Sequence, residues 1–187
     1  MNVSSKISNI VKVGIFAAIT FLGIQMFRIP LPAAVGTPFV HFGHIFVVLG
    51  VLLLGGKYGA ISGTLGLLIF DLVNGYIHSM PQICVETIVK CLLLGYCFTK
   101  FKEVFKDKKS GETIAVFIST IIYGILGIVI DLIMGTILLM ISGSGFVPAF
   151  IGSVTSIPAA TINVIFTIVI VTFIYPIVRR TYNRVNK

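Results

Sequence analysis

Long apolar runs, separated by short polar or proline- and glycine-rich breaks, dominate the pattern along this chain. Six such runs can be distinguished, covering residues 10–27, 41–56, 58–74, 82–99, 113–141 and 155–178. About 20 apolar residues in α-helical conformation are enough to span the hydrocarbon core of a bilayer. The pattern therefore predicts an all-α integral membrane protein with six transmembrane helices, forming a single domain over residues 1–187.

The breaks between the runs contain residues that end helices. Pro30, Pro32 and Pro38 interrupt the first break, and Ser-Gly-Ser-Gly at 142–145 lies in the last. A charged loop at 100–112 connects the fourth and fifth runs. Segments 28–40, 75–81 and 142–154 are then expected as loops on the opposite side of the bundle.

The composition agrees with a membrane protein. The mean hydropathy is +1.09, and only 11% of the residues are charged, whereas soluble domains contain about 25%. This deficit excludes an ordinary soluble globule and an intrinsically disordered chain.

The distribution of basic residues predicts the orientation. A net charge of +8 would suggest nucleic acid as a partner of a soluble protein. With six helices and both termini cytoplasmic, however, twelve of the fourteen basic residues lie on the cytoplasmic side, as expected for a membrane protein. These are Lys6, Lys12, Lys57, Lys100, Lys102, Lys106, Lys108, Lys109, Arg179, Arg180, Arg184 and Lys187. We therefore expect the lipid bilayer, and no nucleic acid, as the partner of these charges. A signal peptide ending near Ala33-Ala34 is the alternative, and its cleavage would leave five helices.

Few polar side chains lie within the apolar runs, and each is a functional candidate because burial of an ionisable group in lipid is unfavourable. They are His41, His44, Asp71, Asn74, Gln82, Glu86, Lys90, Asp131, Asn163 and Thr167. The alternating directions of the helices place most of them in the outer half of the membrane. This placement predicts a pocket open to the outside rather than a pore.

Structural interpretations of the same residues remain open. Glu86 and Lys90, four residues apart, could form an ion pair within one helix. Asp131 could pair with Lys90, and small residues such as Gly59 and Gly63 could serve only helix packing. We expect no metal and no cofactor, since the His-x-x-His spacing of His41 and His44 is a weak signal.

Three short motifs resemble those of the substrate-binding S components of energy-coupling factor (ECF) vitamin transporters, and most closely the riboflavin-type group. They are Val40-His41-Phe42-Gly43, Leu54-Gly55-Gly56-Lys57-Tyr58-Gly59-Ala60 and Phe70-Asp71-Leu72. The resemblance implies a multi-pass subunit of a prokaryotic cell membrane that binds a vitamin and is not an enzyme. It also implies a transmembrane T component and two ABC-type ATPase subunits as partners. The absence of a P-loop from this sequence fits that division of labour.

The family has an Ala-x-x-x-Ala motif in its first helix that contacts the T component. The corresponding residues here are Gly14-Ile15-Phe16-Ala17-Ala18, so the resemblance implies docking through Gly14, Ala17 and Ala18. Glycine replaces the first alanine, but the small-residue character is retained.

We predict a ligand pocket from polar groups and aromatic rings together. The predicted binding residues are His41, Asp71, Asn74, Glu86, Lys90, Asn163, Phe42 and Tyr76, with Phe39 and Phe146 as further stacking or lid residues. The compact polar set and the lack of Trp favour a pyridoxine-like or hydroxymethylpyrimidine-like ligand, with riboflavin next. Two other functions remain open, namely an intramembrane metal-dependent enzyme using His41, His44 and Glu86, and a structural membrane subunit.

Overall fold

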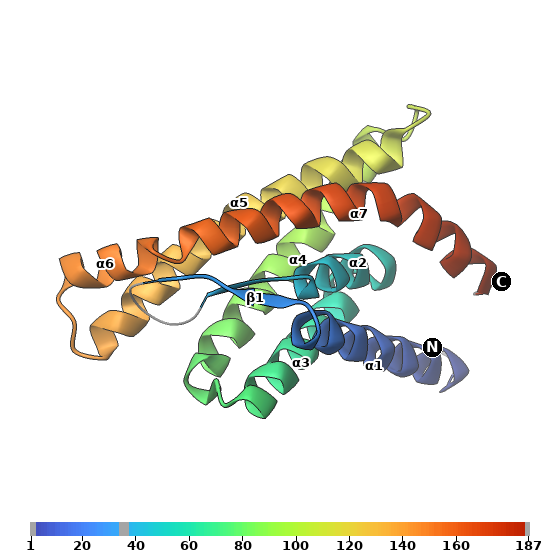
Figure 1. Ribbon diagram of the computed structural model, residues 1–187. Coiled ribbons are helices and arrows are strands. Elements are labelled where there is room, and N and C mark those ends of the chain that lie inside the picture. Colours follow the sequence, from blue (N-terminus) through green and yellow to red (C-terminus); the bar gives the residue numbers. More distant parts are fainter. Residues whose placement is uncertain (1–2, 34–37, 186–187) are drawn as a thin grey trace.

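The protein is an elongated bundle of helices in the computed structural model, which describes residues 3–33 and 38–185 (Figure 1). The helices are α1 (Val3–Gln25), α2 (Gly43–Leu54), α3 (Gly56–Asn74), α4 (Met80–Val104), α5 (Gly111–Ile141), α6 (Phe146–Val154) and α7 (Ile157–Val185). A 3-10 turn, η1 (Ile77–Ser79), precedes α4. Two short strands, β1 (Arg28–Pro30) and β2 (Phe39–His41), pair between α1 and α2.

The two ends of the bundle differ in what they carry. The N-terminus, the C-terminus and the turn between α4 and α5 lie towards one end, whereas α6 and the turn from α3 to α4 lie towards the other (Figure 1). The start of α1, the end of α7 and the charged loop thus lie at the same end of the bundle. The cytoplasmic location of that end stays a prediction.

Four segments are long and apolar enough to cross a membrane among the described residues, namely Lys6–Gln25, Ile77–Val104, Gly111–Ile141 and Phe146–Arg184. The last includes α6 as well as α7. Helix α2 is apolar but has only 12 residues, which corresponds to about 18 Å at 1.5 Å per residue. Helix α3 has 19 residues, but glycines and polar side chains lower its apolar content.

Helix α2 is the centre of the bundle. It packs on α1, α3, α4 and α7, and Val47, Val48 and Val51 are almost completely buried. A helix surrounded on all sides needs no polar stripe, which explains its uniformly apolar sequence.

Close packing of α2 and α3 depends on glycine. A Cβ atom at Gly59 would overlap the backbone of Val51, and one at Gly63 would lie 2.8 Å from Cγ1 of Val47. The connection between these helices also needs glycine, because Gly55 has a φ of 86°. Packing against α2 therefore accounts for Gly59 and Gly63 of α3.

All three segments expected as loops contain regular structure, and the two short strands make the all-α expectation incomplete. Segment 75–81 contains η1 and the first residues of α4. Segment 28–40 contributes β1 and most of β2, whose antiparallel register pairs Arg28 with His41 and Pro30 with Phe39. Segment 142–154 contains α6, which begins directly after the glycine-rich turn. Prolines and glycines correctly indicated breaks in the long helices, but they do not exclude short elements between those breaks.

Candidate functional site

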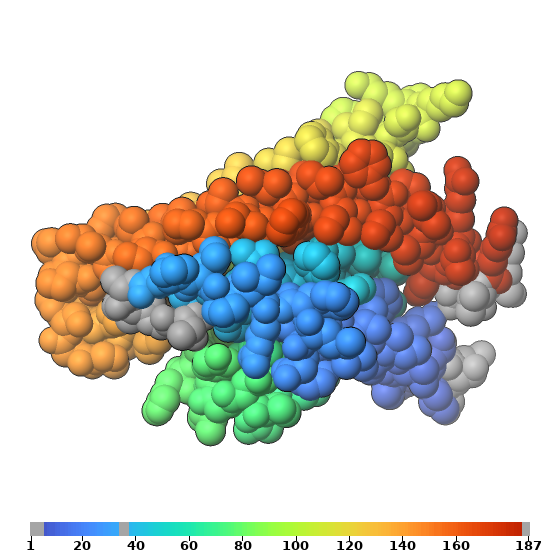
Figure 2. Space-filling view, viewed as in Figure 1, coloured from blue at the N-terminus to red at the C-terminus, as the bar shows by residue number. Residues whose placement is uncertain are grey.

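A cavity of about 540 Å³ lies between the helices at the end of the bundle that carries the β-hairpin and α6. Its walls come from β2, η1, α6, the last turns of α3, the first half of α4, α5 and the first half of α7, together with Ile24 of α1 and His44 of α2. In the space-filling view, the blue hairpin region lies against the orange α7 (Figure 2). The residues that line the cavity include hydrophobic, aromatic and ionisable side chains, as is typical of small-molecule sites.

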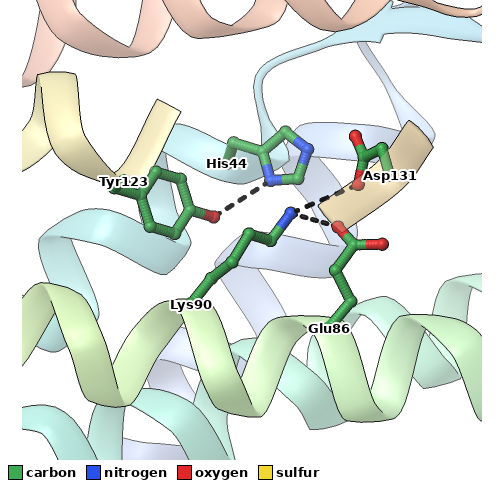
Figure 3. Close-up of polar contacts among 5 residues, drawn as sticks. All are labelled: His44, Glu86, Lys90, Tyr123 and Asp131. Atoms are coloured by element: carbon green, nitrogen blue, oxygen red, sulfur yellow. Dashed lines mark hydrogen bonds and ion pairs between the residues drawn. The ribbon is translucent and has the colours of Figure 1, made fainter. Parts of the chain in front are cut away.

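The most deeply buried charges of the cavity come from α4 and α5. Lys90 is only 4% exposed, and its Nζ contacts Oε1 of Glu86 in the same helix. The same Nζ lies 3.8 Å from Oδ1 of Asp131. Figure 3 shows the three side chains converging from α4 and α5. Two carboxylates thus share one ammonium group, and the Asp131 side chain remains 34% exposed.

One oxygen of this cluster lacks a hydrogen bond. Oδ1 of Asp131 is buried and has no hydrogen-bond partner among the described residues. A buried carboxylate oxygen without such a partner is unfavourable. Because Asp131 lines the cavity, a donor group of a ligand could reach this oxygen.

Histidines extend the polar wall towards α2. The hydroxyl group of Tyr123 lies 3.5 Å from Nδ1 of His44 (Figure 3). The rings of His41 and His44 are 4.7 Å apart. Nδ1 of His41 accepts a hydrogen bond from the backbone N–H of Gly43 at 3.1 Å, which fixes its ring at the start of α2.

A third carboxylate of the cavity comes from α3. Asp71 ends the buried face of α3 and is 4% exposed. Its Oδ2 accepts a long hydrogen bond of 3.4 Å from the hydroxyl group of Ser79. The α3 helix ends here because Gly75 adopts a φ of 81°, which lets the chain turn into η1.

Three aromatic rings line the same cavity as Asp71. The ring centroids of Phe39 and Phe70 are 5.6 Å apart, and Tyr76 stacks on Phe70 at 6.0 Å. All three line the cavity. A flat ligand ring could therefore pack against aromatic faces while its polar groups reach the carboxylates.

Asn163 lines the cavity, but both polar atoms of its side chain already form hydrogen bonds with the backbone of β2. Its Oδ1 accepts a hydrogen bond of 2.8 Å from the backbone N–H of His41, and its Nδ2 donates one of 3.0 Å to the carbonyl of Phe39. The side chain therefore fastens β2 to α7.

Asn74 and Phe42 lie outside the cavity lining. Asn74 accepts a hydrogen bond of 3.0 Å from Nη1 of Arg28 and donates one of 2.8 Å to Oε1 of Gln25. Phe42 stacks on Phe27 at 5.5 Å. Both side chains thus connect the hairpin segment to neighbouring helices, whereas the other six predicted binding residues, His41, Asp71, Glu86, Lys90, Asn163 and Tyr76, line the cavity.

Phe146 also lies elsewhere. It is exposed on α6 and stacks on Phe150 of the same helix. The face of α6 that lines the cavity carries Gly152 and Ser153 instead.

Several lining residues were missed by sequence reasoning. Ser79 and Ser153 lie in segments expected as loops, and Ser156 lies at the very start of the last apolar run, so no helical pattern indicated the direction of these side chains. Gly127 and Gly135 of α5 also line the cavity. A Cβ atom at Gly127 would lie 3.4 Å from Cδ of Lys90. Because Gly127 and Gly135 have no side chains, α5 leaves space beside the charged cluster. The glycines along this apolar run were the feature of the sequence that could have indicated this space.

The histidines do not form a metal site. No group of three or more His, Cys, Asp or Glu side chains in residues 3–33 and 38–185 is arranged to hold a metal ion. The set proposed for a metal-dependent enzyme, His41, His44 and Glu86, is therefore not assembled in this geometry.

Comparisons with known proteins agree with this architecture. A family model described as "ECF-type riboflavin transporter, S component" matches residues 4–180. ThiT from Listeria monocytogenes is a similar solved structure, with a TM-score of 0.68, 16% sequence identity, and coverage of 95% of this chain and 98% of that chain. At this identity the similarity concerns the fold. A comparison with curated protein sequences gives no match.

Proposed function

The chain belongs to the ECF-type riboflavin transporter S component family, whose model matches residues 4–180, and we propose that it captures a small vitamin or vitamin precursor in the 540 Å³ cavity. The family consists of transport components and not of enzymes. In this proposal the ligand enters from outside the cell, and import is driven by ATPase subunits in the same complex.

The proposed orientation has six membrane helices and cytoplasmic termini. It is supported by the segments that carry most of the basic residues, because the start of α1, the end of α7 and the α4–α5 turn lie towards the same end of the bundle (Figure 1). The cavity, with the hairpin and α6 around it, would then face outwards. A prokaryotic cell membrane is the matching location for such an importer.

The chemistry of the ligand follows from an excess of acceptors in the cavity. Asp71, Glu86 and Asp131 provide three carboxylates beside a single lysine. The observation that carries the proposal is the buried Oδ1 of Asp131, which has no hydrogen-bond partner among the described residues. A heteroaromatic ring bearing amino or hydroxyl donors would satisfy this oxygen and pack on the rings around Asp71. A hydroxymethylpyrimidine-like or pyridoxine-like compound has this combination.

Riboflavin is the second candidate, because the matching family is described by that vitamin. Its hydroxyl and ring N–H groups could also donate to the carboxylates. The choice between one ring and three depends on contacts beyond the charged cluster, and a direct comparison of both ligands decides it.

The docking of partner subunits is assigned to the outer face of α1. Gly14 and Ala18 are exposed there, and nothing lies within 4 Å of the position that a Cβ atom at Gly14 would occupy. Ala17 is buried instead and its carbonyl faces Gly66 of α3. We therefore restrict the proposed contact with a T component to Gly14 and Ala18. Because the sequence lacks a P-loop, ATP hydrolysis is left to two ABC-type ATPase subunits.

The first experiment identifies the ligand and tests the carboxylates. Small molecules released from the purified protein by denaturation are identified by mass spectrometry. Hydroxymethylpyrimidine, pyridoxine and riboflavin are then titrated while tyrosine fluorescence is followed, since Tyr76 and Tyr123 line the cavity. Asp71→Asn and Asp131→Asn should each weaken binding about tenfold or more, because a hydrogen bond to a charged group is lost.

Glu103→Gln is the matched control, since it neutralises an exposed carboxylate near the end of α4, away from the cavity. Its affinity should equal that of the unmodified protein. If neither Asp71→Asn nor Asp131→Asn alters the affinity for the ligand that binds, the assignment of this cavity is wrong.

A further inference from the structure

A second cavity of about 270 Å³ lies at the opposite end of the bundle. It is formed by the turn before α5, the first turn of α5 and the last turns of α7. Its lining is predominantly polar and consists of Lys109, Ser110, Glu112, Thr113, Tyr175, Pro176, Arg179, Arg180 and Asn183. None of these residues takes part in the vitamin site proposed above.

Basic side chains outnumber carboxylates in this second cavity. Glu112 is its single carboxylate, and it accepts hydrogen bonds from Nζ of Lys102 at 2.8 Å and from the hydroxyl group of Tyr175 at 2.9 Å. Nε of Arg179 lies 3.8 Å from the same oxygen. The negative charge of Glu112 is thus already matched by basic groups.

Lys109 and Arg180 are the basic groups left over. Neither forms an ion pair with any residue in the described parts of the chain. The preference of basic residues for the cytoplasmic side explains their presence at this end of the bundle. It does not explain why they converge on one concave surface together with hydroxyl and amide groups.

An apolar surface continues from the cavity along the bundle. Ile177 and Phe173 precede Arg180 by three and seven residues, so they lie on the same side of α7, and they are 67% and 74% exposed. On α5, Phe117 follows Thr113 by four residues and is 44% exposed. A phospholipid has a polar headgroup and apolar acyl chains. The polar, positively charged cavity suits the headgroup, and the exposed apolar side chains beside it suit the acyl chains.

We propose that this cavity binds the phosphate group of an anionic phospholipid headgroup, with the acyl chains along Phe117, Phe173 and Ile177. Arginine guanidinium groups fit phosphate oxygens in a bidentate manner. Ser110 and Asn183 supply neutral hydrogen-bond donors beside Arg179 and Arg180. Basic pockets between membrane helices on the cytoplasmic side are suited to such headgroups.

The test measures lipid retention by native mass spectrometry of the detergent-purified protein. Phosphatidylglycerol and phosphatidylcholine are added in turn to the unmodified protein and to Lys109→Gln/Arg180→Gln. We expect phosphatidylglycerol to bind with defined stoichiometry and more tightly than phosphatidylcholine. The double variant should weaken phosphatidylglycerol binding about tenfold or more. Both replaced side chains are exposed and unpaired in the described chain, so the fold should persist.

Lys6→Gln/Lys57→Gln is the matched control, because it removes the same charge from the same end at exposed positions away from the cavity. It should retain phosphatidylglycerol. Equal loss in the control would show diffuse attraction and overturn the proposal. A further arm adds inorganic phosphate, which should leave the bound lipid in place. If phosphate displaces the lipid and its own binding is lost in Lys109→Gln/Arg180→Gln, the site takes the free anion and the lipid assignment is wrong.

Discussion

Lys90 is the residue that neutralises the charged cluster in the proposed vitamin cavity. It is the single cation between Glu86 and Asp131 and it is almost fully buried. A buried ion pair contributes little relative to an apolar replacement of both partners, but removal of one partner leaves an uncompensated charge. The stability of this region should therefore be far more sensitive to Lys90 alone than to the cluster as a whole.

We expect Lys90→Met to lower the free energy of unfolding by about 3 kcal/mol, because two carboxylates would lose their counter-charge. The measurement is the thermal unfolding of the detergent-purified protein. Lys106→Met is the control, since it breaks an exposed pair with Glu103 and should leave Tm unchanged. The double variant Lys90→Met/Glu86→Gln should regain part of the loss. Equal Tm values for the unmodified protein and Lys90→Met would contradict the neutralising role.

The sequence was informative about residues where the relevant contact is local. Glu86 and Lys90 are four apart on one helix, so their ion pair was among the interpretations that spacing alone allowed. Asn74 lies one turn after Asp71, yet it bonds to Arg28 and Gln25 instead of lining the cavity. Helical spacing determines how two side chains are related along a helix. It does not determine which neighbouring element either of them meets.

At the scale of elements, the apolar runs predicted the principal helices well. They gave no indication of β1 and β2, because the pairing of Arg28 with His41 depends on chain segments brought together by the bundle. Helix α6 was missed for a related reason. Its nine residues are too few for a clear periodic pattern, and a Ser-Gly run precedes them.

The contact between α2 and α3 leads to a prediction about Gly59. Alanine usually stabilises a helix relative to glycine by up to about 1 kcal/mol. At Gly59, however, the added Cβ atom would overlap the backbone of Val51, and overpacking typically costs about 1–3 kcal/mol. The steric effect should win, so Gly59→Ala should lower Tm.

Gly14→Ala is the matched control for that substitution, because α1 has open space around the new methyl group. Its Tm should be unchanged or slightly raised. A Tm for Gly59→Ala equal to that of Gly14→Ala would mean that the α2–α3 contact is looser than the structure indicates. Thermal unfolding followed by circular dichroism distinguishes these outcomes.

At the scale of the whole molecule, most of the basic residues and the large cavity belong to different ends of the bundle. The start of α1, the end of α7 and the α4–α5 turn, segments that carry most of the basic residues, lie towards one end of the bundle, whereas α6 and the α3–α4 turn lie towards the other (Figure 1). The 540 Å³ cavity is lined by residues of that second end. The orientation inferred from the sequence depends on the sum of many charges, and it stays a prediction. The ligand could not be predicted, because its identity depends on the relative positions of a few atoms from nine different elements.

The remaining exposed surface of α1 is where the molecule should meet its membrane partner. Because Gly14 has no side chain and Ala18 has only a methyl group, another helix can approach α1 closely at these positions. A leucine at either position would prevent this close approach. We therefore expect Gly14→Leu and Ala18→Leu to abolish co-purification with a T component while vitamin affinity stays unchanged. Thr99→Leu, on the exposed face of α4, is the control. Retention of the partner by both α1 variants would move the docking face elsewhere on the bundle.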